Sequence, residues 1–415
     1  MKKILIVVFA VSLISLAPAN AATMKVTKPL VELGYTKSDQ ISDLLLTPVS
    51  ILLVGTTESQ TSPWLSGTLT GLSDGFISSY SSIGSPMWNL RLPGSSDEIA
   101  TTAAIDSDGS IWVVGAGSSQ VVATPAPSPT RVLNPDNVVI DPTQPATSPI
   151  NRIRIWQVSN TGNLLNSYEY LSPNIITPRK VLISGSNLII VGTLYEKTAS
   201  SGFYLSVTKT GAFSPIIKIG SKNTQINDAI LSTDGSITAV GASGELLLKV
   251  KPISKSDAVT VRISSTGSLQ QVARATLRNT TRSWSSIDTG LLQAGRVLYS
   301  NKQEAAITKF SALNKPVWNV RYLSRSSALA SVSKNTWATF ISAGAIKGVP
   351  TWKPKTATSV LLELGKKGEV ISAYTLTAPA VAISSNNEIG TVQPIAEIGK
   401  ALKTINTERL ENKLP

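Results

Sequence analysis

The segment Ala103-Ala104-Ile105-Asp106-Ser107-Asp108-Gly109-Ser110-Ile111-Trp112-Val113-Val114-Gly115 consists of two apolar runs joined by a short polar turn. This pattern is typical of a β-hairpin, and Asp-Gly is a preferred hairpin turn. Related apolar–turn–apolar units recur along the chain around residues 47–50, 184–187, 232–235, 293–296, 333–336 and 384–387. A unit repeated at such spacing is typical of a solenoid or a propeller, so the repeat decides the fold.

A second turn follows most of these hairpins, at residues 83–85, 160–163, 209–211, 265–267, 313–315 and 366–368. Each repeat then contains four strands, lettered A to D in chain order. In the repeat that holds the opening segment, we expect them at residues 102–105, 111–114, 152–158 and 164–170. Radial repetition of four-stranded antiparallel units predicts an all-β fold, a single β-propeller. The turns predict seven blades, with six and eight as alternatives.

The two chain ends are predicted to share one blade. Pro86-Met87-Trp88-Asn89-Leu90-Arg91 closely matches Pro316-Val317-Trp318-Asn319-Val320-Arg321, and both follow a C–D turn, so both are predicted D strands. Residues 29–33 carry a related pattern with no A, B or C strand before them. We therefore expect this N-terminal strand to close the ring against strands at 381–384, 389–395 and 401–406. Residues 395–415 are weakly defined, because their apolar residues also fit a helical stripe.

The first 21 residues have the pattern of a secretory leader. Lys2 and Lys3 precede an apolar stretch over residues 4–16, and Ala19-Asn20-Ala21 is a small-residue cleavage site. We expect cleavage after Ala21, a propeller domain over residues 22–415, and a secreted or cell-surface location without a transmembrane segment in the mature chain. A retained membrane anchor is the alternative interpretation.

The chain contains no cysteine and no histidine. Their absence excludes disulfides, thiolate or histidine metal ligands and a Ser-His-Asp triad, and the sequence predicts no cofactor and no metal site. The formal net charge is +13, which suggests affinity for acidic polymers such as anionic cell-wall glycans or nucleic acid. A mildly basic, solvated surface is the alternative. No nucleic-acid motif is recognised, so no specific nucleic-acid partner is expected.

Residues 74–80, Trp88 and residues 105–115 together resemble the bacterial SBBP-type β-propeller repeat. The match is good over residues 72–116 and degenerate elsewhere. The resemblance implies an exported or surface propeller, and it implies no particular chemistry.

Every large insertion is predicted between strands B and C, at residues 56–74, 116–150, 193–202, 242–258 and 343–358. The insertion at 116–150 is rich in proline. In a four-stranded blade all B–C loops lie on one face of the propeller, and loops on a rigid scaffold commonly carry function. Trp64 and Trp352 lie in these loops, with Lys353 and Lys355 beside Trp352. Aromatic rings suit sugar stacking and lysines suit anionic groups, so these four residues are the predicted binding residues; a tryptophan tucked against its own blade is the alternative.

Catalysis has little support in the sequence. Glycosidic chemistry needs two carboxylates in one cleft, and no such pair is recognisable. Glu196 is the best single candidate for an acid, whereas Asp106 and Asp108 are explained by their hairpin turn. No catalytic residue is predicted. The leading hypothesis is a non-enzymatic exported propeller that binds an envelope glycan or a surface protein through its B–C face. A carbohydrate-active enzyme, hydrolase or lyase, is the alternative, and a purely structural envelope component is a third possibility.

Overall fold

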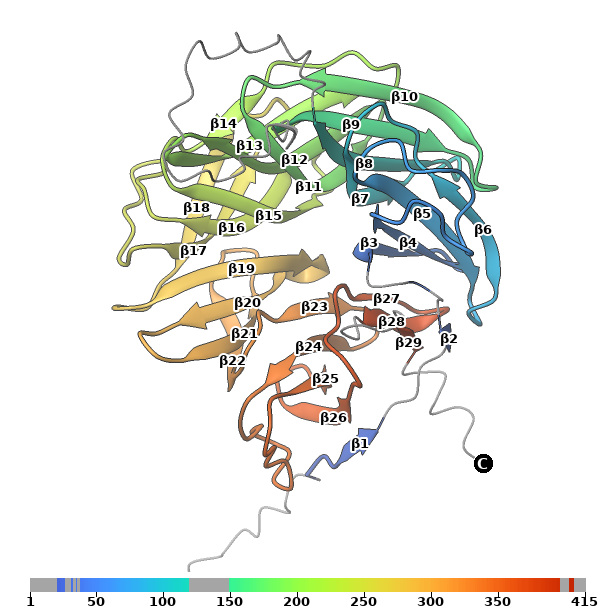
Figure 1. The fold of residues 1–415 in the computed structure, drawn as a ribbon. Helices are drawn as coiled ribbons and strands as arrows, with labels where there is room; N and C mark the ends of the chain where they lie inside the picture. The colour runs from blue at the N-terminus through green and yellow to red at the C-terminus, as the bar shows by residue number, and fades with distance from the viewer. Residues whose placement is uncertain are drawn as a thin grey trace, which may run out of the picture.

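The computed structural model describes residues 21–26, 31–32, 35, 38–118, 149–395 and 403–406. The expected leader and most of the proline-rich insertion lie outside the described residues. The described chain is built from antiparallel β-sheets arranged around a central axis (Figure 1). Within these ranges, no helix is long and apolar enough to cross a membrane.

Six blades are complete four-stranded antiparallel sheets whose strands follow one another in chain order. Blades 1 to 3 are formed by β3 (Asp39–Leu46), β4 (Ser50–Thr57), β5 (Asp74–Ser81) and β6 (Pro86–Arg91); β7 (Glu98–Ile105), β8 (Ile111–Ser118), β9 (Ile150–Val158) and β10 (Leu164–Leu171); β11 (Ile175–Ser184), β12 (Asn187–Glu196), β13 (Ala199–Thr208) and β14 (Ile217–Ile219). Blades 4 to 6 are formed by β15 (Thr224–Leu231), β16 (Ile237–Ser243), β17 (Asp257–Ile263) and β18 (Leu269–Ala275); β19 (Thr281–Asp288), β20 (Leu292–Leu298), β21 (Gln303–Phe310) and β22 (Pro316–Leu323); β23 (Leu329–Val332), β24 (Thr336–Ser342), β25 (Thr358–Leu364) and β26 (Val370–Thr375).

The chain ends add to this ring in two places. β1 (Met24–Val26) pairs in parallel with β26 and extends blade 6 to five strands, which the sequence pattern did not predict. A short terminal sheet has the order β2 (Val31–Glu32), β29 (Lys403–Asn406), β28 (Gly390–Ile395) and β27 (Ser384–Asn386). In it Val31 pairs with Thr404, so the N-terminal strand joins strands from the C-terminus. β27 lies between β23 and β3 (Figure 1).

The prediction of seven blades is wrong, because the structure has six complete blades. The turn around residues 384–387 was counted as a seventh hairpin, but Ser384, Ser385 and Asn386 form the strand β27 itself. The expected first strand at 381–384 is therefore displaced. Beside blade strands of up to 10 residues, β27 has 3 residues and β2 has 2. The terminal sheet fills the remaining sector with four short antiparallel strands, three from the C-terminal part of the chain and one from the N-terminal part.

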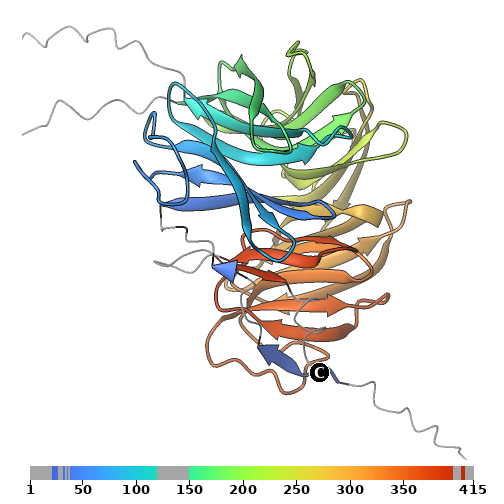
Figure 2. The same ribbon diagram turned by 90° about the vertical axis from the view of Figure 1, so that its right-hand side faces the viewer.

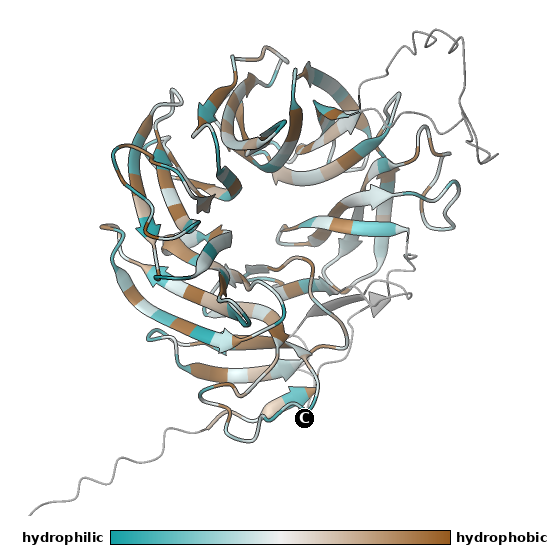
Figure 3. Ribbon diagram, turned by 60° about the vertical axis from the view of Figure 1, so that its left-hand side comes forward, coloured by the Kyte–Doolittle hydropathy of each residue, from teal (hydrophilic) through white to brown (hydrophobic). Residues whose placement is uncertain are grey.

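The hydrophobic core lies between neighbouring sheets. Neighbouring sheets stand side by side around the ring (Figure 2), and apolar residues occur along the strands of the blades (Figure 3). The apolar side chains of one sheet pack against those of the next, and the second strands β4 and β8 are buried over almost their whole length. Trp156 of blade 2 belongs to the cluster shared with blade 1, Trp112 of blade 2 to the cluster shared with blade 3, and Trp337 of blade 6 to the cluster shared with the segment before β27. All three rings are buried. The strand tryptophans thus hold the blades to one another.

The innermost strand of five blades contains a β-bulge. Pairing shifts by one residue within β3, β7, β11, β15 and β19. Opposite each bulge the second strand has a glycine, at Gly55, Gly115, Gly192, Gly241 and Gly295. A Cβ on Gly115 would lie 1.9 Å from the Ile99 carbonyl oxygen. The glycines are needed because the bulged backbone occupies the space of a side chain.

Candidate functional site

The bulges determine which side chains face the central axis. The extra residue in each bulged strand has no partner in the ladder and points away from it. These residues are Ser42, Thr101, Arg179, Asn227 and Ser285, and all of them line a central cavity of about 440 Å³. The backbone of five different blades therefore places polar side chains around one cavity.

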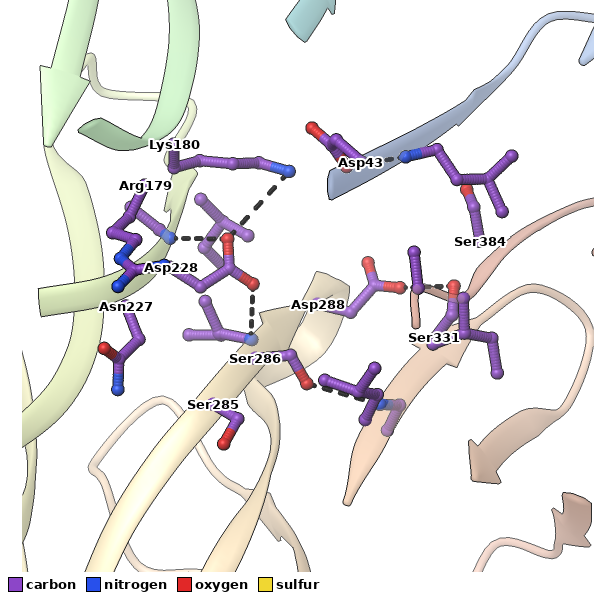
Figure 4. Close-up of a pocket in the computed structure, with 18 of the residues that line it drawn as sticks. Asp43, Arg179, Lys180, Asn227, Asp228, Ser285, Ser286, Asp288, Ser331 and Ser384 are labelled. Carbon is purple, nitrogen blue, oxygen red and sulfur yellow. Dashed lines mark hydrogen bonds and ion pairs between the residues drawn. The ribbon is translucent and has the colours of Figure 1, made fainter. Parts of the chain in front are cut away.

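A lysine and three carboxylates also line this cavity, where Lys180 extends toward Asp228 and Asp43 and Asp288 lie on the surrounding strands (Figure 4). The Lys180 ammonium is 3.9 Å from Asp228 Oδ1. The nearby carboxylate of Asp43, followed by those of Asp228 and Asp288, raises the pKa of Lys180 above its usual value despite the opposing effect of burial. The acidic groups around Lys180 therefore favour its charged form.

The same carboxylates join neighbouring blades. Asp43 of blade 1 accepts hydrogen bonds from Thr102 Oγ1 (2.9 Å) and the Ala103 amide (3.1 Å) of blade 2. Asp228 of blade 4 accepts the Ile287 amide of blade 5 at 2.9 Å. Asp288 of blade 5 accepts from blade 6, where Ser331 and Val332 are the donors. These contacts link adjacent inner strands, which gives the three aspartates a structural task.

Asp228 has the most perturbed carboxylate of the cavity. Burial raises its pKa to about 6, against the lowering effects of Lys180 and of the backbone amides of Ile287 and Ala229. Its side chain is only 16% exposed, in keeping with a large desolvation effect. A carboxyl group titrating near pH 6 can hold or release a proton under mildly acidic conditions.

A second cavity, also of about 440 Å³, adjoins the central cavity at one end of the ring. We call the two cavities together the channel, and this end of it the mouth. Arg179, Asn227 and Ser285 line both cavities, so the two are adjacent. Its other lining residues come from the strands of blades 4 and 5 and from the adjoining loops: Gln225, Ala242, Ser256, Thr281, Ser283, Arg296 and Ser327. The lining is made of guanidinium, hydroxyl and amide groups with one alanine, and it contains no carboxylate.

This mouth opens on the face that carries the long loops, which we call the long-loop face. It contains the loops 58–73, 244–256 and 343–357 between second and third strands, together with the segments that cross from one blade to the next. The expected insertion at 193–202 is instead an extension of the hairpin, because β12 and β13 remain paired up to Glu196 and Ala199. The opposite face carries the turns that join first to second and third to fourth strands, and we call it the short-turn face.

Exposed cations are concentrated on the long-loop face. They are Lys197, Lys222, Lys249, Lys251, Lys255, Arg278, Lys302, Arg325, Lys347, Lys353 and Lys355. The turns of the short-turn face carry both signs, with Lys315, Lys334, Lys366 and Lys367 beside Asp108, Asp234, Glu369 and Glu388. Among the residues that the structure describes, positive charge is thus unevenly distributed, and its field is directed toward the long loops.

Acidic side chains of the long-loop face are largely used to anchor the loops. The Asp74 carboxylate accepts hydrogen bonds from the amide and the hydroxyl of Thr70. It also forms an ion pair with Arg91 at 3.0 Å. In blade 4, Asp257 accepts the Ile253 amide at 2.8 Å. Glu245 accepts from the amides of residues 221–223. Because these carboxylates are engaged within the protein, they do little to offset the exposed lysines.

The predicted binding residues lie on this face in two separate places. Trp64 of blade 1 donates Nε1–H to Asp39 at 3.3 Å and packs against Tyr35, with ring centroids 4.1 Å apart. Trp352 of blade 6 donates Nε1–H to Ser342 at 3.1 Å. Both rings are half-buried, whereas Lys353 and Lys355 are exposed. The tryptophans fasten their own loops and belong to different hydrophobic clusters.

The other acidic candidates have local partners. Glu196 pairs with Lys218 and accepts from Asn174 Nδ2 at 3.4 Å. Asp106 forms an ion pair with Lys209 and accepts a hydrogen bond from the Ser107 amide, while Asp108 accepts a hydrogen bond from the Ser110 amide. In the part of the chain that the structure describes, no group of three or more acidic residues is arranged to hold a metal ion.

Sequence reasoning missed the channel residues, above all Arg179, Lys180, Asp228 and Arg296. A bulge breaks the alternation that identifies the inward face of a strand. Two consecutive polar residues such as Arg179 and Lys180 therefore do not look like residues of one inward face, although both line the cavity. The available signal was the repeated glycine in the second strand, since Val54-Gly55, Val114-Gly115, Val191-Gly192 and Val240-Gly241 occupy equivalent positions.

The chain matches no protein-family model. No curated protein matches it either. Among solved structures, the chain is similar to the Dos1 propeller at 10% identity, covering 92% of this chain and 81% of that one with a TM-score of 0.48. It is also similar to the WD40 domain of Toxoplasma gondii coronin, at 12% identity over 93% and 88% with a TM-score of 0.45, and to the β-propeller domain of the trilobed protease from Pyrococcus furiosus, at 8% identity over 88% and 95% with a TM-score of 0.43. These structures are propellers, and no family is assigned to the chain.

Proposed function

We propose that this chain is an exported, non-catalytic propeller that binds an anionic envelope glycan or surface protein through its long-loop face. The observation that carries the proposal is the concentration of exposed cations on that face, around the mouth of a polar cavity. Long loops, exposed lysines and a concave polar site on one side of a rigid ring are what recognition of an anionic partner requires. The leader pattern of residues 1–21 and the resemblance to SBBP-type repeats supply the expectation of export.

Sedimentation of purified residues 22–415 with isolated cell envelopes tests this proposal. Replacing Lys353 and Lys355 by glutamine, or Trp64 and Trp352 by alanine, should reduce retention, since each change alters the long-loop face. The control is Ile83→Ala/Leu313→Ala, because these residues are 64% and 76% exposed on the short-turn face. Equal retention of all variants, or no retention of the wild type, would contradict the proposal.

A carbohydrate-active enzyme is the second candidate, and the raised pKa of Asp228 favours it. A carboxyl group with a pKa of about 6 beside the carboxylates Asp43 and Asp288 resembles the acid of a glycosidase pair. Binding is the better-supported function because these aspartates already accept hydrogen bonds from neighbouring strands. Polysaccharide turnover that is abolished in Asp228→Asn but kept in Trp64→Ala would establish the enzyme instead.

A further inference from the structure

Two arginines at the long-loop mouth differ from the paired arginines of the protein. Arg91, Arg152, Arg154, Arg262, Arg274 and Arg321 all form ion pairs with carboxylates. Arg179 and Arg296 line the mouth cavity and are exposed. Neither has a carboxylate within ion-pair distance among the residues that the structure describes. Both guanidinium groups are therefore available to a ligand.

The backbone of both arginines is fixed by the inner sheet. Arg179 is the extra residue of the bulge in β11, and a Cβ on Gly192 opposite would lie 3.0 Å from its amide nitrogen. Arg296 follows Gly295 on β20 and pairs with Ser283 of β19. Side chains on rigid strands can be presented with little loss of backbone entropy on binding.

The remaining lining suits a hydroxylated ligand. Ser256, Thr281, Ser283 and Ser327 contribute hydroxyl groups, and Gln225 contributes an amide. A guanidinium group donates parallel hydrogen bonds to a carboxylate or a phosphate. A volume of about 440 Å³ lies within the usual range of small-ligand sites. This combination fits one or two sugar units that carry an oxyanion.

We propose that Arg179 and Arg296 form an oxyanion subsite that holds the carboxylate or phosphate of an acidic glycan at the long-loop mouth of the channel. The hydroxyl and amide groups of the lining bind the sugar hydroxyls. This inference rests on the proposed function and narrows its ligand to an acidic polysaccharide.

Isothermal titration calorimetry with defined oligomers tests the subsite. The probes are a galacturonate oligomer for carboxylates, a glycerol-phosphate oligomer for phosphates and maltotetraose as a neutral sugar. The variants are Arg179→Gln, Arg296→Gln and the double variant. The control is Arg325→Gln, which removes an exposed charge from the same face outside the cavity lining.

We expect at least one acidic oligomer to bind, and each single variant to weaken it about 10- to 100-fold, the range for a lost charge-assisted hydrogen bond. Arg325→Gln should stay within about threefold of the wild type, a change of the size expected for one screened surface charge. Binding of one oligomer alone identifies its anion, and binding of both identifies a general oxyanion site.

Three results would overturn the subsite: no acidic oligomer binds, maltotetraose binds as tightly, or Arg325→Gln loses as much affinity as Arg179→Gln. The envelope assay then separates the two proposals. If the wild type is still retained on envelopes and Lys353→Gln/Lys355→Gln is not, the binding function stands without the arginine subsite. If the wild type is not retained, the binding function fails as well.

Discussion

Asp74 and Asp257 occupy equivalent positions, each at the start of the third strand of its blade. Asp74 pairs with Arg91, and their side chains are 0% and 8% exposed; Asp257 lies 3.9 Å from Arg274, with side chains 0% and 3% exposed. Each aspartate also accepts an amide from the loop residue four positions earlier. The buried charge at the base of a long loop thus determines the path by which the loop leaves its blade.

Replacing Asp74 by asparagine should destabilise the protein by about 3–5 kcal/mol, because it leaves the buried Arg91 without its counter-charge. Chemical denaturation gives the free energy of unfolding. The control is Asp234→Asn, which breaks the exposed pair with Arg262 and should leave the unfolding midpoint unchanged. Similar effects of the two substitutions would mean that the buried pair has no special role.

Glu245 should make the free energy of unfolding depend on pH in the acidic range. Burial opposes ionisation, but hydrogen bonds from Thr224 and from the amides of Asn223, Lys222 and Ser221 lower its pKa to about 2. The folded pKa lies below the unfolded value, so the stabilisation is present at neutral pH and is lost as the pH falls from about 4.5 through 2. Glu245→Gln should be less stable than the wild type at pH 7, and the difference in their free energies of unfolding should decrease toward pH 2. A difference independent of pH would contradict this account.

Between elements, an aromatic residue on the outer strand of one blade covers a glycine turn of the next. Trp88 of β6 donates Nε1–H to the Asn160 carbonyl at 3.0 Å, and a Cβ on Gly162 would lie 2.7 Å from the indole ring. Tyr168 lies over Gly211 in the same way, and Trp318 lies over Gly368. This recurring contact links each of these blades to the next at the outer edge of the ring.

A double-mutant cycle should resolve this contact. Gly162 has φ +86°, and Gly185 has φ +60° with no atom within 4 Å of an added Cβ. Both alanine substitutions incur the cost of a left-handed backbone, but Gly162→Ala should cost about 1–3 kcal/mol more because it also overpacks against Trp88. In a Trp88→Ala background the excess should disappear. If Gly162→Ala remains more destabilising than Gly185→Ala in that background, the additional cost does not come from the contact with Trp88.

Across the whole molecule, the ring is completed by strands from both chain ends. Truncation after Ile395 removes β29, to which β2 pairs, and should lower the melting temperature because it exposes the edges of the terminal sheet. Truncation after Asn406 keeps β29 and should leave the melting temperature unchanged. If both truncations behave alike, the terminal sheet does not contribute to closure.

Much of this architecture was predictable from residue patterns. The apolar run of β8, the alternation of β9, the Asp-Gly turn between β7 and β8, and the similar strands around Trp88 and Trp318 indicated four-stranded blades. The blade count was wrong because the residues around 384–387 have the pattern of a hairpin turn, whereas Ser384–Asn386 form the strand β27. The channel residues were missed because the bulges that aim Arg179 and Asn227 inward break the alternation of their strands. The repeated Val-Gly pairs of the second strands were the signal for these bulges, but they indicate the inward side chains only once strand pairing is known.

The most direct test of the central claim compares two variants with the same net charge. One changes Lys251, Lys255, Lys353 and Lys355 to glutamate on the long-loop face, and the other changes Lys315, Lys334, Lys366 and Lys367 to glutamate on the short-turn face. All eight lysines are exposed. Envelope sedimentation at physiological salt should show retention lost in the first variant and kept in the second. Equal loss in both variants would show that net charge alone governs retention. Retention of both variants would show that the lysines of the long-loop face do not mediate envelope binding.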